Sequence, residues 1–490
     1  MVSGSEKTGI TAYGGYVPRL RLQKKSIAEA NAWFDASLSG LAKGEKAICN
    51  WDEDVITMAV EACNDCIFDE HEKKISSLVM ASTSMPFLDR QNSVVVSEAL
   101  NLEKKHLRTM DVTSSQRAAT SGLLAALDMA AIGEGESLLV ASEHRRTLCS
   151  SREEMLYGDA AAALTLGRER ILAETVGSYS YPVDFVDHYR SEESEFDYVW
   201  EERWIRDEGY LKIVPGAVSD MLNKTSILPD SINHFIAPSA YAGNIAKVIG
   251  INQDAIVDTM ASTVGLAGAA HPILMLAKCL ESSKPGDLIL MVGFGQGCDV
   301  VLFRATDLVL SYQPKLGVSG HLEQGCPETN YNKFLSFNGL LKKDFGRRSE
   351  VDKQAYLPAM YRNNKLINSF SGGRCKACNT IQIPKRQYCT NPDCDALDSQ
   401  EDYCFSRVNG SVMSWTADRL TFDNSPPAYF GMVEFEPGGR MMMDFADVNP
   451  DEFGVETKVS MCFRIKQIDK QRGFKKYFWK ARPVTEKQTI

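Results

Sequence analysis

Four cysteines in the C-terminal third of the chain have a spacing that predicts chemistry. Cys375, Cys378, Cys389 and Cys394 form the pattern C-x2-C-x10-C-x4-C. Two close pairs of thiolates can converge on one tetrahedral Zn²⁺, and a site with four protein ligands leaves no open position for a substrate. The spacing therefore predicts a structural zinc ion. The alternatives are two disulfides, which a reducing cytosol disfavours, or four unrelated thiols.

The composition indicates what kind of protein would carry such a site. The 490 residues correspond to about three domains at about 150 residues each. With 54 Lys and Arg against 64 Asp and Glu, the net charge is −10, which argues against nucleic acid as a partner. No apolar run is long enough for a transmembrane helix, and the N-terminus lacks the apolar core of a signal peptide. We therefore expect a cytoplasmic protein that binds neither nucleic acid nor membrane.

Strands and helices alternate along the first 310 residues. Short apolar runs predict buried strands at 76–82, 136–142, 160–167, 232–238 and 287–295. Apolar residues at helical spacing predict helices at 53–67, 120–133 and 272–283. This alternation predicts a largely parallel sheet covered on both faces, and the pattern occurs twice. A polar and aromatic insertion near 181–212 is either a dimer or lid element or a solvated loop with a helix.

The character of the sequence changes after residue 310. Residues 311–370 are rich in turn formers and include a basic stretch, which predicts a linker with one or two helices. After Cys394, short alternating runs punctuated by Gly and Pro predict a small all-β barrel.

Five stretches of the N-terminal part resemble landmarks of the thiolase superfamily, at 16–22, 52–62, 111–127, 158–167 and 284–297. Within that superfamily they are most similar to archaeal-type hydroxymethylglutaryl-CoA synthases and to type III ketoacyl synthases. The segment from about 330 to 485 is similar to the zinc-ribbon and OB-fold proteins that accompany acyl-CoA thiolases.

This resemblance implies the fold and the ligands. It implies an α/β fold with a five-layered αβαβα core made of two βα halves, a zinc ribbon and an OB-fold barrel. The implied boundaries are 1–170 and 171–310 for the halves, 311–370 for the linker, 371–400 for the ribbon and 401–490 for the barrel. It also implies acyl-CoA thioesters as substrates, a homodimer, and a structural zinc in the ribbon.

The same resemblance indicates that the catalytic residues of the family are replaced in this chain. The family's nucleophilic Cys stands at the start of a buried helix, where the helix dipole lowers a thiol pKa, and it aligns here with Gln116. A carboxamide is not a nucleophile, so no acyl-enzyme can form there. The family's acid/base Glu aligns with Thr83, its Asn with Leu266, and the segment 235–241 contains no His.

Other side chains remain as candidates for catalysis. Ser114 or Ser115 would serve as nucleophile if a base lay close by. His271 stands in A-A-H-P, which resembles the G-H-P motif of degradative thiolases, and is a candidate catalytic residue. Tyr241 lies in the loop where the family His is missing; it either transfers a proton or packs at the rim of the site.

Three functions are consistent with these residues. The first is an enzyme that makes or breaks a C–C bond next to a CoA thioester through an enolate, by aldol, retro-aldol or decarboxylative chemistry, with Gln116 holding the enolate oxygen. The second is a non-catalytic subunit in a hetero-complex with an active thiolase-family protein. The third is a conventional acyltransferase whose nucleophile lies elsewhere.

A basic run near the linker is a candidate site for the phosphates of CoA. It consists of Lys342, Lys343, Arg347 and Arg348. The alternative is a charge run that simply faces water.

Overall fold

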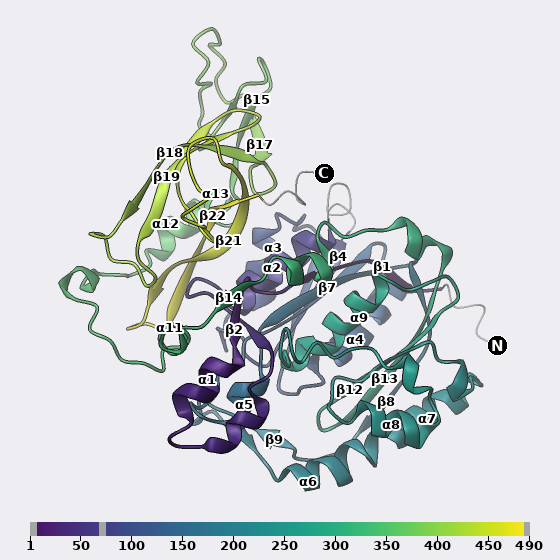
Figure 1. The fold of residues 1–490 in the computed structure, drawn as a ribbon. Coiled ribbons are helices and arrows are strands. Elements are labelled where there is room, and N and C mark those ends of the chain that lie inside the picture. The colour runs from purple at the N-terminus through teal and green to yellow at the C-terminus, as the bar shows by residue number, and fades with distance from the viewer. Residues whose placement is uncertain (1–6, 68–74, 485–490) are drawn as a thin grey trace. The chain divides into compact units, whose positions relative to one another are not determined.

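The computed structural model describes residues 7–67 and 75–484. Residues 1–6, which begin the N-terminus discussed above, and 485–490, which end the predicted barrel, lie outside the described residues. The chain divides into two compact units. The first comprises residues 1–50, 54–94 and 102–340, and the second comprises 51–53, 95–101 and 341–490 (Figure 1).

A nine-stranded sheet forms the centre of the first unit (Figure 1). Its order is β11 (His234–Ile236), β12 (Leu288–Phe294), β13 (Gly297–Ala305), β8 (Ala173–Pro182), β1 (Gly9–Tyr16), β7 (Ala160–Gly167), β6 (Glu136–Glu143), β4 (Ile75–Ala81) and β5 (Arg108–Val112). The five strands predicted from apolar runs are β4, β6, β7, β11 and β12, so those predictions are confirmed.

The sheet contains the same pairing pattern twice, as the repeated sequence pattern predicts. In one half β1 pairs with β7 and β7 with β6 in antiparallel fashion, and β6 pairs with β4 in parallel. In the other half β8, β13, β12 and β11 repeat that succession. A short antiparallel contact between β1 and β8 joins the halves.

The expectation of a largely parallel sheet is wrong, because the sheet is mixed. The chain turns directly from β12 into β13 through Gly295 and Gln296, without the helical crossover that a parallel pair requires. Gln296 and Gly297 have φ angles of +52° and +110°, which a tight reversal of this kind demands.

Helices complete a five-layered αβαβα arrangement. The central pair, α4 (Ala118–Ile132) and α9 (His271–Leu280), packs in one apolar cluster with strands of both halves. One outer layer includes α2 (Val55–Cys66), which packs on β1, β6 and β7. The other consists of α7 (Ile213–Thr225) and α8 (Ala242–Ile249). The three predicted helices correspond to α2, α4 and α9.

The remaining elements of the first unit lie around this core. They are β2 (Leu20–Gln23), α1 (Lys24–Asn31), β3 (Glu45–Ile48), α5 (Arg152–Leu156), β9 (His188–Tyr189), β10 (Tyr198–Val199), α6 (Glu202–Trp204), the π-helical turn Ile205–Tyr210, α10 (Gly317–Glu323), β14 (Cys326–Glu328) and α11 (Tyr331–Phe337). Helix α3 (Asn92–Ala99) contributes to both units.

The second unit is mostly β-structure, as predicted. Strands β15 (Ser371–Cys375), β16 (Ile381–Gln382) and β17 (Gln400–Cys404) form a small sheet, preceded by α12 (Leu357–Arg362) and α13 (Asn364–Ile367). The larger sheet has the order β20 (Arg440–Asp444), β19 (Ala428–Phe435), β18 (Gly410–Asp418), β21 (Lys458–Asp469) and β22 (Phe474–Pro483). A bridge between Phe445 and Ala481 joins the two edges of this sheet, so its strands close on themselves.

Two buried cations of the second unit are neutralised by the segment 51–53. The ammonium of Lys480 lies 2.8 Å from Asp52, and both side chains are less than a tenth exposed. Arg464 is 1% exposed and pairs with Glu53 and, at 2.8 Å, with Asp447. Burial alone would raise the pKa of Asp52, but Lys480 and Arg464 lower it below its ordinary value. Asp52 is therefore held as a buried carboxylate.

No helix in the described ranges 7–67 and 75–484 combines the length and the apolarity needed to cross a membrane.

Candidate functional site

Gln116 lies in a tight turn between β5 and α4. The helix begins at Ala118, slightly earlier than the predicted start at residue 120, and Gln116 stands just before its first turn. Ser114 has a φ of +72°, which reverses the chain after β5. The Ser115 hydroxyl donates to the carbonyl of Gly295 at 2.9 Å and accepts from the Arg117 N–H at 3.2 Å. Ser115 thus fixes the turn, and both of these contacts of its hydroxyl are with backbone groups.

Gly295 lets the β12–β13 turn approach this site closely. A Cβ at position 295 would lie 3.1 Å from the Cβ of Gln116 and 3.0 Å from the Ser115 hydroxyl. A side chain there would therefore push the Gln116 turn outward, which explains glycine at this position.

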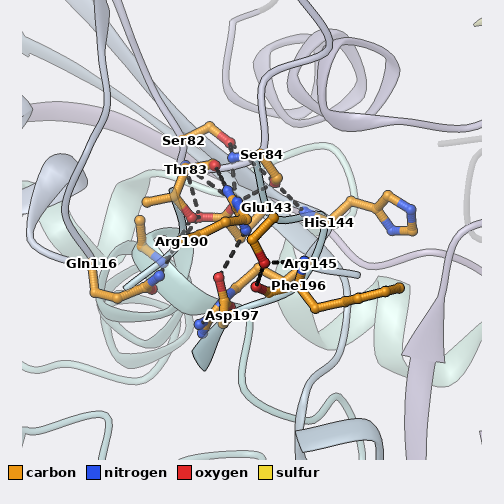
Figure 2. Close-up of polar contacts among 12 residues, drawn as sticks. Ser82, Thr83, Ser84, Gln116, Glu143, His144, Arg145, Arg190, Phe196 and Asp197 are labelled. Atoms are coloured by element: carbon orange, nitrogen blue, oxygen red, sulfur yellow. Dashed lines mark hydrogen bonds and ion pairs between the residues drawn. The ribbon is translucent and has the colours of Figure 1, made fainter. Parts of the chain in front are cut away.

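A hydrogen-bonded chain connects Gln116 with Thr83 and Glu143 (Figure 2). The Gln116 amide donates to the Thr83 hydroxyl at 3.4 Å, and that hydroxyl donates to Glu143 Oε2 at 3.1 Å. The structure therefore brings together the two positions that the family resemblance aligned with its Cys and its Glu, and it adds a carboxylate from the end of β6.

Glu143 is the main residue that sequence reasoning missed. It is fully buried and accepts hydrogen bonds from the Thr83 N–H at 3.1 Å, from the Ser82 hydroxyl at 3.2 Å and from the Ala269 N–H at 3.3 Å. The Ser84 hydroxyl also donates to it. Hydrogen-bond donors therefore surround this buried carboxylate, as a buried polar group requires. A Glu that follows the apolar run 138–141 at the buried end of β6 was the signal that could have identified it.

The 181–212 insertion contributes charged residues to the same site (Figure 2). Asp197 accepts from Arg145 Nε at 3.0 Å and from Arg190 Nη1 at 2.9 Å, and Arg190 also donates to the carbonyl of Thr83. Arg145 follows Glu143 after β6, and its guanidinium lies 3.9 Å from the ring centre of Tyr157. Part of the insertion is thus a wall of the candidate site.

His271 is held by backbone groups on both ring nitrogens. Nδ1 accepts from the Ala267 N–H at 3.1 Å, and Nε2 lies 2.8 Å from the carbonyl of Thr259. Burial lowers the pKa of His271 from 6.5 to about 4. The ring is therefore neutral with Nε2 donating, an arrangement that fixes the loop between these residues.

Tyr241 and Leu266 have local partners. The Tyr241 hydroxyl donates to Glu202 at 3.1 Å, and burial together with that carboxylate raises the tyrosine pKa. Its ring lies 5.5 Å from that of Tyr210, which packs 4.3 Å from Phe294 beside the Gly295 turn. Leu266 forms a backbone bridge with Tyr157. The structure thus does not join Tyr241 by a hydrogen bond to the Gln116 chain.

A second cluster of metal-ligating types lies beside His144. The donor atoms of Cys49, His144 and Asp159 are within 4.8 Å of one another. Asp159 Oδ2 accepts from the Cys49 N–H at 2.7 Å and lies 3.0 Å from His144 Nδ1. Hydrogen bonding accounts for this cluster.

The four cysteines of the ribbon segment converge as the spacing predicts. The four Sγ atoms lie within 4.8 Å of one another, with 3.9 Å between Cys375 and Cys394 and 3.5 Å between Cys378 and Cys389. A tetrahedral Zn²⁺ with Zn–S bonds of about 2.3 Å separates its sulfurs by about 3.8 Å. The residues present therefore fit a zinc ion.

The basic run is exposed in the second unit. All four of its side chains, Lys342, Lys343, Arg347 and Arg348, face solvent in a loop that ends in a single 3-10 turn.

Known proteins resemble this chain over most of the first unit. Residues 222–302 match the family model described as 3-oxoacyl-[acyl-carrier-protein] synthase III, C-terminal. A hydroxymethylglutaryl-CoA synthase of Pyrobaculum arsenaticum is 28% identical over 324 residues, which cover 64% of this chain and 91% of that protein.

Solved structures show the same fold. A hydroxymethylglutaryl-CoA synthase complexed with CoA superposes with a TM-score of 0.58 at 15% identity, covering 71% of this chain and 95% of that one. The HMG synthase of the curacin biosynthetic pathway, in complex with an acetyl donor acyl carrier protein, has a TM-score of 0.59 at 18% identity and covers 81% and 100%.

The layered α/β fold of the first unit is the fold of these solved hydroxymethylglutaryl-CoA synthases. Its sequence is similar to hydroxymethylglutaryl-CoA synthases and, over residues 222–302, to the C-terminal part of 3-oxoacyl-[acyl-carrier-protein] synthase III.

Proposed function

We propose that the first unit is an enzyme that makes or breaks a C–C bond next to a CoA thioester through an enolate, without a cysteine acyl-enzyme. The similarity to hydroxymethylglutaryl-CoA synthases supports CoA-thioester chemistry. Gln116 at the position of the nucleophile supports a route in which no bond to the protein forms.

The hydrogen-bonded chain from Gln116 through Thr83 to Glu143 carries this proposal. The Gln116 carboxamide has a second N–H with which it can bind the thioester oxygen as negative charge develops on it. The Thr83 hydroxyl, which donates to a buried carboxylate, can accept a proton from substrate while passing its own to Glu143. An oxyanion donor beside a proton acceptor is what an aldol or retro-aldol step requires.

Replacing Gln116 by Ala tests this function. Turnover of a CoA thioester should fall about 100-fold, the scale observed when one oxyanion donor is lost. Intact mass should show no acyl adduct during turnover, and iodoacetamide should leave activity in place. Rapid inactivation that substrate prevents and that maps to one Cys would instead indicate a conventional acyltransferase.

A non-catalytic subunit is the second candidate function. The backbone contacts on both nitrogens of His271 favour it, because they give that residue a structural role. In this case the purified chain would bind CoA without turning over any thioester, and activity would appear only in a hetero-complex with an active thiolase-family protein.

We further propose that the second unit is a zinc ribbon followed by an OB-fold barrel. The convergence of four cysteines and the closed five-stranded sheet support this assignment. Zinc would be structural, held by Cys375, Cys378, Cys389 and Cys394, and the exposed basic run would bind the phosphates of CoA.

A homodimer through the core is the assembly we propose. Strand β5 is an edge of the nine-stranded sheet, and such an edge can pair with a second copy across a two-fold axis. Light scattering that gives the 54.3 kDa mass of one chain at micromolar concentration would contradict it.

A further inference from the structure

The residue that follows Gln116 forms a buried ion pair across the two halves of the first unit. Arg117 Nη1 donates to Asp299 Oδ1 at 2.9 Å, and the two side chains are 17% and 1% exposed. Arg117 stands in the turn between β5 and α4 of one half, and Asp299 lies in β13 of the other, 182 positions later in the chain. We infer that Asp299 is a positioning residue that, through Arg117, holds the Gln116 carboxamide in the place that the proposed reaction requires.

Asp299 also binds the first turn of α4. Its second oxygen, Oδ2, accepts from the hydroxyls of Thr120 at 3.0 Å and Ser121 at 2.8 Å. The N-cap residue, Arg117, has no side-chain capping hydrogen bond to the helix, and its side chain reaches Asp299 instead. A carboxylate is also favoured near the N-terminus of a helix, where the macrodipole is positive. Both oxygens of one buried carboxylate therefore fix the start of α4 against β13.

The carbonyl of Gly295 connects this anchor to Gln116. Arg117 Nε donates to it at 3.2 Å, and the Ser115 hydroxyl donates to the same oxygen at 2.9 Å. The residues on both sides of Gln116 are therefore bonded to one backbone group of the β12–β13 turn. The side chain of Gln116 itself makes a long contact, 3.4 Å from its amide nitrogen to the Thr83 hydroxyl. Its position consequently depends on Ser115 and Arg117, and Asp299 sets the position of Arg117.

The face of β13 that carries Asp299 is otherwise apolar. Val301 and Phe303, the next residues on the same face of the strand, belong to the apolar cluster that includes α4 and α9. Packing alone would call for a third apolar side chain at position 299. A buried ion pair adds little net stability, because the cost of desolvating both charges offsets their attraction. The geometry of the Gln116 turn, rather than stability, therefore accounts for the carboxylate.

This role rests on the proposed function and adds a residue to it. A donor stabilises an enolate oxygen when it lies within hydrogen-bond distance of the place where the charge develops. A displacement of about 1 Å lowers the rate of an enzyme by up to about 100-fold. The carboxamide of Gln116 must therefore be held accurately. A buried carboxylate that is bonded to three side chains at the start of α4 supplies a rigid support.

Hydrogen exchange of the full chain, measured by mass spectrometry, tests the support itself. Asp299→Asn keeps the size of the side chain and removes its charge. Backbone amides of residues 114–121 should exchange about tenfold faster in this variant, the scale expected when a hydrogen bond to a charged group is lost, while those of α2 keep their rate. Arg117→Lys keeps the charge but lacks the planar fork that reaches both Asp299 and Gly295, and it should give the same local increase.

Asp65→Asn is the matched control. Asp65 is also a buried carboxylate of the first unit, 4% exposed, and it accepts from the N–H groups of Gly15 at 2.9 Å and Leu316 at 2.6 Å. Its replacement should leave the exchange of residues 114–121 unchanged.

Turnover separates a positioning role from a merely structural one. The probes are 3-hydroxy-3-methylglutaryl-CoA, which a retro-aldol step cleaves to acetyl-CoA and acetoacetate, and malonyl-CoA, which loses CO₂ and takes up a proton to give acetyl-CoA. Asp299→Asn should lower kcat about 10- to 100-fold and leave KM close to its native value. In a Gln116→Ala background the same substitution should lower kcat less than about threefold, because the group that Asp299 positions is gone. Asp65→Asn should leave kcat per folded molecule unchanged.

Two results would overturn the inference alone. One is equal exchange of residues 114–121 in the native chain and in Asp299→Asn. The other is a fall in kcat by the same factor in both backgrounds, which would make Asp299 a structural residue. Conversion of neither thioester by the native chain would count against the proposed function, and the exchange result would then decide whether Asp299 supports the Gln116 turn.

Discussion

Acidification should destabilise the first unit through His271, and the size of the effect follows from the contacts of the ring. Protonating this histidine would require burying a charge and would oppose the Ala267 N–H that donates to Nδ1. Burial accordingly lowers the pKa of His271 from 6.5 to about 4. The variant that removes the titrating group is His271→Asn, whose side-chain oxygen can still accept a hydrogen bond.

The sign follows from proton binding. Between pH 6.5 and about 4 the unfolded chain holds more protons at this position than the folded chain does, so stability falls as the pH falls. With these two pKa values, the loss between pH 7 and pH 5 is about 2 kcal/mol, and it reaches about 3.4 kcal/mol below pH 4. At pH 7 the ring is mostly neutral in both the folded and the unfolded chain, so its titration changes the free energy of unfolding little.

Urea unfolding at pH 7 and pH 5 measures this effect. The stability advantage of the native chain over His271→Asn should shrink by about 2 kcal/mol between the two pH values. The control is His106→Asn, because His106 is exposed and its φ of +68° suits asparagine. Histidine C2-hydrogen exchange measured by mass spectrometry should show that His271 in the folded chain titrates below pH 5. Titration near 6.5 would refute the reasoning.

Three further predictions concern the second unit. Metal analysis should find one zinc per chain. Cys378→Ser should lose the metal and unfold the ribbon, because zinc binding supplies much of the folding energy of such a module. Cys404→Ser is the control and should keep the zinc. Lys480→Met should lower the free energy of unfolding by about 3–5 kcal/mol, because it leaves the buried Asp52 without its hydrogen-bonded ammonium partner. The control is Lys466→Met in the exposed pair of Lys466 with Asp444, which should cost less than about 1 kcal/mol. Replacing the four residues of the basic run by Ala should weaken CoA binding about tenfold or more, since phosphate contacts are charge-assisted. The run comprises Lys342, Lys343, Arg347 and Arg348.

Each of these predictions has a result that would contradict it. Zinc-free native protein would remove the metal site. A Lys480→Met variant as stable as the native chain would mean that water reaches Asp52. Unchanged CoA affinity would make the basic run a solvated surface.

The sequence predicted the elements that local patterns determine. Apolar periodicity identified β4, β6, β7, α4 and α9, because a strand or helix buried on two sides must be apolar over its whole length. The spacing of the cysteines predicted their convergence, which the Sγ distances show. The parallel character of the sheet was mispredicted, because a two-residue turn can replace a helical crossover without changing the apolar pattern of the strands it joins.

The wall of the candidate site could not be predicted from the sequence. Glu143 interacts with Thr83 across 60 positions of sequence, and Arg190 reaches Thr83 across 107. No periodicity determines such contacts, since they depend on loop conformations that the sheet only anchors. The surroundings of His271 could not be predicted for a related reason: its neighbouring residues resemble a catalytic motif, but its two ring nitrogens contact backbone groups of residues 259 and 267.

The pairing of Asp52 with Lys480 also constrains how the protein is made. These partners are 428 residues apart in sequence. At a translation rate of about 5–20 residues per second, Asp52 is synthesised about 20 to 90 s before its cation. The second unit therefore cannot complete its interior while the chain grows. During that interval Asp52, and Glu53 beside it, remain anions that must stay hydrated. The last β-hairpin, which includes Arg464 and Lys480, therefore completes the folding of a unit whose first residues were made near the beginning of synthesis.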